Sequence, residues 1–143
     1  MKITLQRIDD AFNMEAVDEN GRKVSMDTTE EKGGKNNGIR PMNMLIMGLG
    51  GCASIDVIMI LKKQKQEIED FRIAIEGERE MGKEPALWEK IHMVFTLTGK
   101  IEKGKAERAV ELSMQKYCSV SATLRLANAQ ISWEVEVNSS GHQ

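Results

Sequence analysis

The feature that most constrains the fold is a long apolar stretch, Pro41 to Leu61, which reads PMNMLIMGLGGCASIDVIMIL. Proline suits the first turn of a helix, because its missing N–H leaves no bond unmade there. From Met44 onward the residues are apolar on all sides, which indicates a helix enclosed by other elements. We therefore expect a long central helix over residues 41–66, ending in a lysine-rich segment that suits the C-terminal end of the helix dipole.

The same stretch is long enough to cross a membrane, since about 20 apolar residues span a bilayer. We favour a protein with no membrane partner, because Asp56 interrupts the stretch and the flanking sequence alternates as soluble strands do. Three glycines, Gly48, Gly50 and Gly51, each cost about 1 kcal/mol of helix propensity, which indicates close approach of another backbone. Because so short a chain has little else to surround a helix, we expect a homodimer whose central helices pack across a two-fold axis through this glycine face.

The segments before the helix predict a small sheet and a loop. Three short runs alternate between apolar and polar residues, and Asn20-Gly21 predicts a hairpin turn, so we expect an antiparallel β-meander over residues 1–27. The polar segment 28–40, rich in glycine and asparagine, predicts a mobile loop. It is either a surface insertion or a flap over a functional site.

The segments after the helix predict a β-hairpin over 71–98, two helices over 104–127 and a last strand over 131–137. We expect Cys118 to break the helical segment and Ser119 to cap the short helix that follows. The predicted order is β-β-β-α-β-β-α-α-β. Strands and helices partly occur in runs, which indicates an α+β fold with a largely antiparallel sheet.

Composition narrows the classes of function. A length of 143 residues fits one domain, residues 1–143. The net charge of −2 and 4% aromatic residues provide neither a basic field nor a stacking surface, so no nucleic-acid partner is expected. The N-terminal residues lack the apolar core of a signal peptide, which favours a cytoplasmic location. The only histidines, His92 and His142, have no other ligands nearby in sequence, so no metal site is expected.

The two cysteines, Cys52 and Cys118, are the candidate reactive groups. A cysteine is nucleophilic as the thiolate, which needs positive charge nearby. Cys118 lies where a short helix begins, and the helix dipole would favour its thiolate. Cys52 lies inside a helix and needs a cation that the fold brings to it. From composition alone, two buried, inert cysteines are the default interpretation. The candidate cations are Arg40, Arg79, Arg125 and, more weakly, Arg22.

Two motifs around these cysteines, GGCASIDVIMILKK and KYCSVSATL, resemble the OsmC/Ohr family of thiol-dependent organic hydroperoxide reductases. The nearest match is the OsmC-like, YhfA-type branch, and the resemblance extends through IEGERE, the strand that begins at Trp88, and LSMQKYCSVS. It implies an OsmC-like fold, in which a sheet wraps around the long buried central helices of an intertwined homodimer.

The resemblance also implies a chemistry. Cys52 would attack the distal oxygen of an organic hydroperoxide and become a sulfenic acid, which Cys118 would resolve as a disulfide. A dithiol reductant would then restore both thiols by exchange, and no metal or organic cofactor is implied. An apolar lining would suit an alkyl or lipid hydroperoxide or another small apolar ligand. The lining residues would be Met42, Met44, Leu45, Met47 and Ile58, and the substrate-binding candidates are Asn43, Met44 and Met47.

One position departs from the family pattern. Family members usually carry a glutamate nine residues before the first cysteine, where it orients an arginine, and this chain has Asn43 there. Asparagine accepts a hydrogen bond from a guanidinium but cannot form the bidentate ion pair. Arg40 and Arg79 are the arginines that we expect at Cys52, and the carboxylates that could orient them instead are Asp56, Glu78 and Glu80. The function is therefore a cysteine-based peroxidase of oxidative-stress defence, or a catalytically weak dimer that binds a small apolar ligand or senses oxidants through its thiols.

Overall fold

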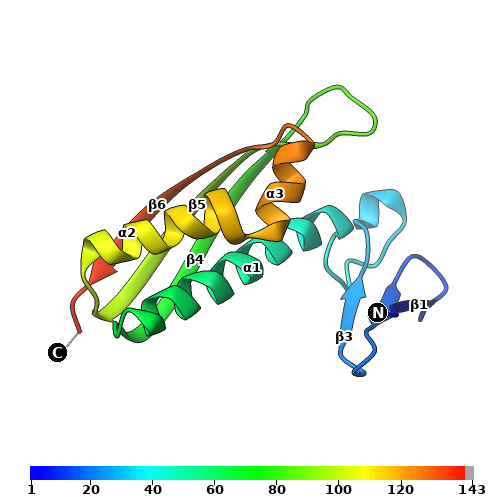
Figure 1. Ribbon diagram of the computed structural model, residues 1–143. Helices are drawn as coiled ribbons and strands as arrows, with labels where there is room; N and C mark the ends of the chain where they lie inside the picture. Colours follow the sequence, from blue (N-terminus) through cyan, green and yellow to red (C-terminus); the bar gives the residue numbers. More distant parts are fainter. Residues whose placement is uncertain (141–143) are drawn as a thin grey trace. The chain divides into compact units, whose positions relative to one another are not determined.

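Figure 1 shows the computed structural model, which describes residues 1–140. His142 lies outside the described residues. The chain divides into two compact units, Met1–Leu45 and Ile46–Gln143, and each is described by itself. The elements follow the predicted order, with a short 3-10 helix added in the loop and a π-helical turn before the last helix. The α+β prediction is confirmed.

The first unit contains the predicted β-meander. Strands β1 (Thr4–Arg7), β2 (Met14–Val17) and β3 (Lys23–Met26) form an antiparallel sheet in the order β1-β2-β3. The β2–β3 turn contains Gly21 at φ 78°, a conformation that glycine adopts without strain. The prediction from Asn-Gly therefore identified this hairpin correctly.

The loop that follows is organised around the buried carboxylate of Asp27. Its oxygens accept hydrogen bonds from the backbone N–H groups of Thr28, Lys35 and Asn37, at 2.7, 3.3 and 3.0 Å. The 3-10 helix η1 (Glu30–Lys32) lies within this loop. Backbone hydrogen bonds, the foremost from Asn37, lower the pKa of Asp27 because they stabilise its charged form. The loop thus has one anchor to which three of its N–H groups point.

Helix α1 (Pro41–Lys63) begins at the predicted proline and ends three residues earlier than the predicted position 66. The chain turns at Lys65, whose φ of 57° is left-handed, and leads directly into the next strand. Along α1, Leu49, Ala53 and Val57 are fully buried at four-residue spacing. The opposite face carries exposed apolar side chains, so a single chain encloses only one side of this helix. The exposed apolar residues of this face are Met47, Ile55, Ile58 and Met59. Leu45, one turn before Leu49, is also exposed.

By length and composition α1 would also pass as a membrane span. Core helices of soluble proteins pass the same test, and 22% of its most apolar window is buried in the structure. The expected absence of a membrane partner stays a prediction.

The second unit is built on a three-stranded sheet of order β4-β5-β6. Strands β4 (Glu67–Arg79) and β5 (Trp88–Lys100) form the predicted hairpin, and β6 (Gln130–Asn138) pairs with β5 in parallel. The remaining pairings of both sheets are antiparallel, so the sheet prediction holds, with this one parallel pair added. A parallel neighbour requires a crossover connection, which the helical segment between β5 and β6 supplies.

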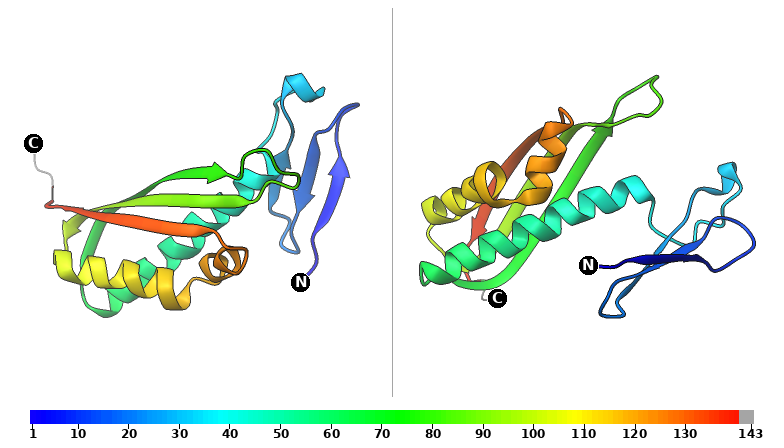
Figure 2. Two further views of the ribbon diagram at one scale, coloured as in Figure 1. Left: turned by 90° about the horizontal axis from the view of Figure 1, so that it is seen from above. Right: turned by 45° about the vertical axis from the view of Figure 1, so that its right-hand side comes forward.

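Three helical pieces make up the crossover, namely α2 (Lys103–Leu112), the π-helical turn η2 (Ser113–Tyr117) and α3 (Ser119–Leu126). Figure 2 shows α1, α2 and α3 on one face of the β4-β5-β6 sheet. The inward side chains of β5 are at most 1% exposed, as their alternation predicts, and they are Ile91, Met93, Phe95 and Leu97. They form one core with the buried face of α1 and with α2.

The glycines of α1 divide between the two sides of the helix. Gly50 is buried, and a Cβ there would lie 2.9 Å from Cδ1 of Ile75 on β4, so this glycine allows the helix to approach the sheet closely. A Cβ at Gly48 or Gly51 would meet nothing within 4 Å. Gly50 therefore faces the sheet of its own chain, contrary to the predicted glycine face, and a dimer contact at Gly48 and Gly51 stays a prediction.

Candidate active site

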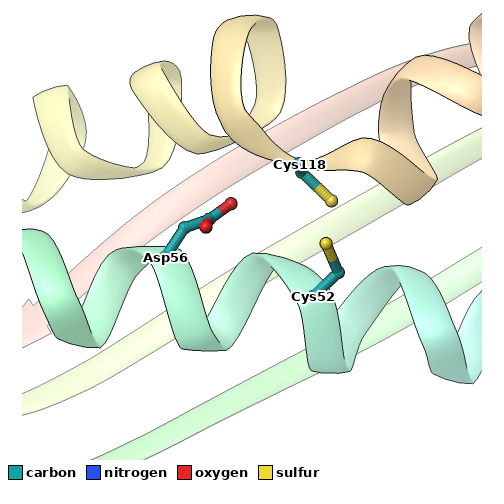
Figure 3. A group of neighbouring side chains, drawn as sticks. All are labelled: Cys52, Asp56 and Cys118. Carbon is teal, nitrogen blue, oxygen red and sulfur yellow. The ribbon is translucent and has the colours of Figure 1, made fainter.

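The fold brings together three side chains from two distant segments, Cys52, Asp56 and Cys118 (Figure 3). Cys52 and Asp56 are four residues apart on α1, so they lie on the same side of the helix, one turn from each other. Cys118 lies between η2 and α3, and its sulfur points toward that of Cys52. The two sulfurs and a carboxylate oxygen all lie within 4.8 Å of one another.

The π-helical turn positions Cys118. The Cys118 N–H donates to the carbonyl of Ser113, five residues earlier, at 2.8 Å, and the chain then leaves the helix with Cys118 extended at φ −73°, ψ 107°. Cys118 is consequently the N-cap of α3, and its Sγ accepts a hydrogen bond from Ser121 N at 3.4 Å. The prediction of Ser119 as N-cap is wrong, because Ser119 is already the first helical residue.

Asp56 is held from the other side by Ser113, which is fully buried. The Ser113 hydroxyl donates to Oδ2 of Asp56 at 2.9 Å. In the same segment, the buried Ser121 hydroxyl donates to the carbonyl of Met114 at 3.0 Å. A charged acceptor with a buried donor is among the stronger side-chain hydrogen bonds, so the carboxylate is fixed beside the two sulfurs.

The environment of Cys118 favours the neutral thiol. Its side chain is 2% exposed, and burial, followed by the hydrogen bond with Cys52, raises the pKa of Cys118 to about 11. The hydrogen bond from Ser121 acts in the opposite direction and is the weaker effect. The N–H groups at the start of α3 therefore act in the expected direction, toward the thiolate, but desolvation outweighs them.

Arg40, Asn43 and Met44 belong to the first unit. One nitrogen of Arg40, Nη1, donates to the carbonyls of Asp27 and Gly38 at 3.2 and 3.0 Å, and Nη2 donates to the side chain of Asn36. The backbone N–H of Asn43 bonds to the carbonyl of Arg40 at 2.9 Å, as expected for a first helical turn. Arg40 thus ties the loop to the start of α1, and its predicted role at Cys52 stays a prediction.

Arg79 lies at the end of β4. Its Nε and Nη2 both donate to the carbonyl of Ala86, at 3.1 and 2.7 Å, and its guanidinium carbon lies 5.7 Å from the centre of the Trp88 ring. This arginine therefore braces the β4–β5 connection. Its predicted role in stabilising a thiolate also stays a prediction, as does substrate contact by Met47, which is 52% exposed on α1.

An open groove adjoins the cluster and shares Asp56 with it. The groove has a volume of about 500 Å³ and lies between α1 and the α2–η2 segment. Its lining is largely apolar, with Met59, Ile60, Leu112 and Tyr117 beside the polar groups of Lys63 and Gln64. Asp56 is the one lining residue that the groove shares with the cluster.

A second polar group lies on the open face of the sheet. His92 Nδ1 is 2.7 Å from the Ser132 hydroxyl, and Nε2 is 3.3 Å from a carboxylate oxygen of Glu134. His92 is half-exposed, on the strand face opposite Phe95 as predicted. These cross-strand contacts join solvated side chains. His92 and Ser132 also line an open pocket of about 470 Å³ on this side of the sheet.

Comparison with known families decides the classification. The profile of a family described as OsmC-like protein matches residues 34–134 of this chain. The chain belongs to the OsmC-like family. Protein YhfA of Escherichia coli (strain K12) is 42% identical over 97 residues, which cover 66% of this chain and 72% of YhfA. Both the family and the resemblance to its YhfA-type branch are thus confirmed.

Solved structures agree with the OsmC-like fold. A hypothetical protein from Aquifex aeolicus VF5 is 34% identical with a TM-score of 0.78, and the match covers 95% of this chain and 96% of that one. The organic hydroperoxide resistance protein OhrB of Bacillus subtilis is 18% identical with a TM-score of 0.66, covering 94% and 96%. At that identity the likeness to OhrB shows the shared fold.

Sequence reasoning identified both cysteines but not the partner that holds the third side chain. Asp56 entered it only as one carboxylate that could orient an arginine, whereas the structure pairs it with Ser113. A polar residue one helical turn after a cysteine, inside an apolar helix, was the available signal. Its partner is 57 positions away in sequence, which no local pattern indicates.

Proposed function

We propose that this protein is a thiol-dependent peroxidase that reduces organic hydroperoxides in oxidative-stress defence, with Cys52 as the peroxidatic and Cys118 as the resolving cysteine. The observation that carries the proposal is the proximity of the two sulfurs, within 4.8 Å, although their residues are far apart in sequence. A disulfide requires sulfurs about 2.05 Å apart, so a movement of less than ~3 Å joins them. Membership of a family that includes proteins named for organic hydroperoxide resistance supports it further.

The reaction would proceed in two steps. The Cys52 thiolate attacks the distal peroxide oxygen, the O–O bond breaks, and the alcohol leaves after taking up a proton, with sulfenic acid left on Cys52. Cys118 then attacks that sulfur, the S–S bond forms, the S–O bond breaks, and water leaves. A dithiol outside the protein restores both thiols and becomes a disulfide itself.

The surroundings of the sulfurs support this division of roles. With a pKa of about 11, Cys118 is a thiol at neutral pH, which suits the later step better than the first attack. The Asp56 carboxylate, within 4.8 Å of both sulfurs, is placed to take the proton that Cys118 gives up as the disulfide forms. The groove beside Asp56 would hold the organic part of the hydroperoxide.

The protein would act as a cytoplasmic homodimer. The support for a dimer comes from α1. The exposed fractions of Met47, Ile55 and Met59 on its outer face are 52%, 62% and 52%. A contiguous apolar face of this kind on one helix suits burial against a second copy. Gly48 and Gly51, with open space around them, would permit close approach of the partner helix.

A second function has support of its own. The protein would be a catalytically weak dimer that binds a small apolar ligand or senses oxidants through its thiols. Asn43 stands where relatives carry the glutamate that orients an arginine. Arg79 already donates twice to Ala86, and the ionisable group observed beside the sulfurs is the carboxylate of Asp56.

A thiol count separates the two functions. Reduced protein is mixed with a slight excess of cumene hydroperoxide, and free thiols are titrated over one minute. The peroxidase loses both thiols of each chain, and the chain has no other cysteine to obscure the count. Cys52→Ser abolishes the reaction, and Cys118→Ser stops it at sulfenic acid. Thiol counts that stay unchanged for an hour would favour the binding protein.

A second experiment addresses the departure at Asn43. Asn43→Glu restores the carboxylate that the family uses to orient an arginine, so it should speed the oxidation of Cys52. Stopped-flow measurement of thiol loss at one fixed peroxide concentration gives the rate. An unchanged rate would mean that another group already orients the cation or that no arginine serves this site.

A further inference from the structure

The cluster that forms the candidate active site has the composition of a cation site. It contains two sulfur ligands and one carboxylate, whose ligand atoms all lie within 4.8 Å of one another (Figure 3). The sequence predicts no metal site because its ligands are dispersed. The fold overcomes this dispersion by bringing Cys118 over the Cys52–Asp56 turn of α1.

We propose that the reduced protein binds one thiophilic divalent cation, zinc by preference, between the sulfurs of Cys52 and Cys118 and the carboxylate of Asp56. This proposal goes beyond the peroxidase function and does not depend on it, because reduced thiols can bind a metal whether or not they react with peroxides.

The geometry fits a tetrahedral ion after small movements. With Zn–S near 2.3 Å, two sulfurs of a tetrahedral zinc site lie about 3.8 Å apart, and sulfur and oxygen lie slightly closer. The three ligand atoms here lie within 4.8 Å of one another, so each pair needs to close by no more than about 1 Å to 1.5 Å. Cys52 and Asp56 both project from one side of α1 toward Cys118, as Figure 3 shows.

Hydrogen bonds support two of the three proposed ligands, as they do in known metal sites. Ser113 donates to Oδ2 of Asp56 and so restrains the carboxylate, whose oxygens keep further lone pairs for an ion. Ser121 N–H donates to Cys118 Sγ, an N–H···S contact that also stabilises a metal-bound thiolate. Such supporting bonds hold ligands in place and tune affinity.

The ligand types indicate which cation binds. Thiolates select zinc and related soft ions over magnesium or calcium, which prefer sites made of oxygen. Three protein ligands leave the fourth tetrahedral position to water, or to a molecule that enters from the adjoining groove. Because the metal and a Cys52–Cys118 disulfide require the same sulfurs, the metal-bound and disulfide forms exclude each other.

The test is a metal titration of the reduced full-length protein. Zinc is titrated against a chromophoric chelator, and one zinc per chain is expected. Cobalt added instead should give sulfur-to-cobalt charge-transfer absorption in the near ultraviolet and the intense visible bands of a tetrahedral ion. Cys52→Ser and Cys118→Ser should each weaken zinc binding at least a hundredfold and lower the charge-transfer intensity.

The decisive variants concern the carboxylate. Asp56→Asn should weaken zinc binding at least tenfold, and Ser113→Ala, which leaves all three ligands in place, should weaken it several-fold. Asp70→Asn makes the same substitution at an exposed position on β4 and should change nothing. Zinc affinities of Asp56→Asn and Ser113→Ala equal to those of the wild type and Asp70→Asn would overturn the proposal. So would zinc bound without fixed stoichiometry, and if Asp56→Asn does not fold, Ser113→Ala decides.

Discussion

The assignment of Cys118 as the N-cap of α3 leads to a stability prediction that separates it from its neighbour Ser119. Cys118→Ala removes the Sγ that accepts the Ser121 N–H, and it removes a side chain that is 2% exposed. Ser119→Ala removes an exposed hydroxyl from the first helical residue. Cys118→Ser keeps an acceptor at the capping position and is the matched intermediate case.

The magnitudes follow from these contacts. Loss of an N-cap acceptor costs about 1 kcal/mol, and removal of one buried heavy atom of this size costs about 1 kcal/mol more. Cys118→Ala should therefore lower the free energy of unfolding by about 2 kcal/mol. Ser119→Ala should change it by less than about 0.5 kcal/mol. Cys118→Ser should lie between the two, because oxygen caps a helix better than sulfur but suits an apolar cavity less.

The assay is denaturant unfolding followed by circular dichroism, with excess reductant and one fixed protein concentration for all variants. Reductant keeps a disulfide from contributing, and a fixed concentration keeps subunit association constant. Thermal unfolding can serve as a second measurement. For a chain of this length, 2 kcal/mol corresponds to a decrease of roughly 6 °C in Tm. If Ser119→Ala costs as much as Cys118→Ala, the reasoning about the cap is wrong.

Two further predictions concern α1 and the first unit. Gly51→Ala adds a Cβ that meets nothing within the described chain, so it should leave the fold intact. It should nevertheless shift the proposed dimer toward monomer, as measured by light scattering. Gly104→Ala adds an equally unobstructed Cβ on α2 and should leave the dimer unchanged. An unchanged dimer would place the two-fold contact elsewhere on α1. Because the folded pKa of Asp27 is lowered, its carboxylate stabilises the fold above its unfolded pKa near 3.8, and this stabilisation disappears as the pH falls through the folded value. Asp27→Asn should therefore flatten the acid side of a stability–pH profile measured by urea unfolding, and an acid limb identical to that of the wild type would contradict this.

The fold was predictable to the extent that its information is local. The alternation of Ile91, Met93 and Phe95 fixes which face of β5 is buried, and the proline fixes where α1 begins. The end of α1 was not predictable, because Lys65 adopts a left-handed conformation that lysine rarely signals. The parallel pairing of β5 with β6 depends on how the helices between them pack, which is a property of the tertiary structure.

In the candidate site, too, local features could be predicted from the sequence, whereas features of the tertiary structure could not. The pairing of Cys52 with Cys118 was expected from family resemblance, and neither their spacing nor their surroundings in sequence requires it. The effect of the helix N-terminus on Cys118 could be predicted from sequence, whereas the burial that outweighs it could not. The bond from Ser113 to Asp56 links two segments that meet only in the folded chain, so it was missed.

The charge of the site connects its two proposed activities and gives a last prediction. A thiolate on either cysteine would lie within 4.8 Å of the Asp56 carboxylate, where two unit charges at an effective dielectric constant of 20 repel by about 3.5 kcal/mol. A cation at the site would offset this repulsion, and an arginine and a zinc ion would have opposite consequences. An arginine leaves the sulfur lone pairs free to attack peroxide, whereas zinc occupies them.

Zinc should therefore slow the oxidation of Cys52 by cumene hydroperoxide, and a chelator should restore the full rate. The rate of thiol loss is measured across a zinc titration, with Asp56→Asn as the variant in which the same zinc concentrations protect at least tenfold less well. Magnesium at the same concentrations is the control, because it binds oxygen ligands and should leave the rate unchanged. Equal oxidation rates with and without saturating zinc would show that the ion does not occupy the sulfurs.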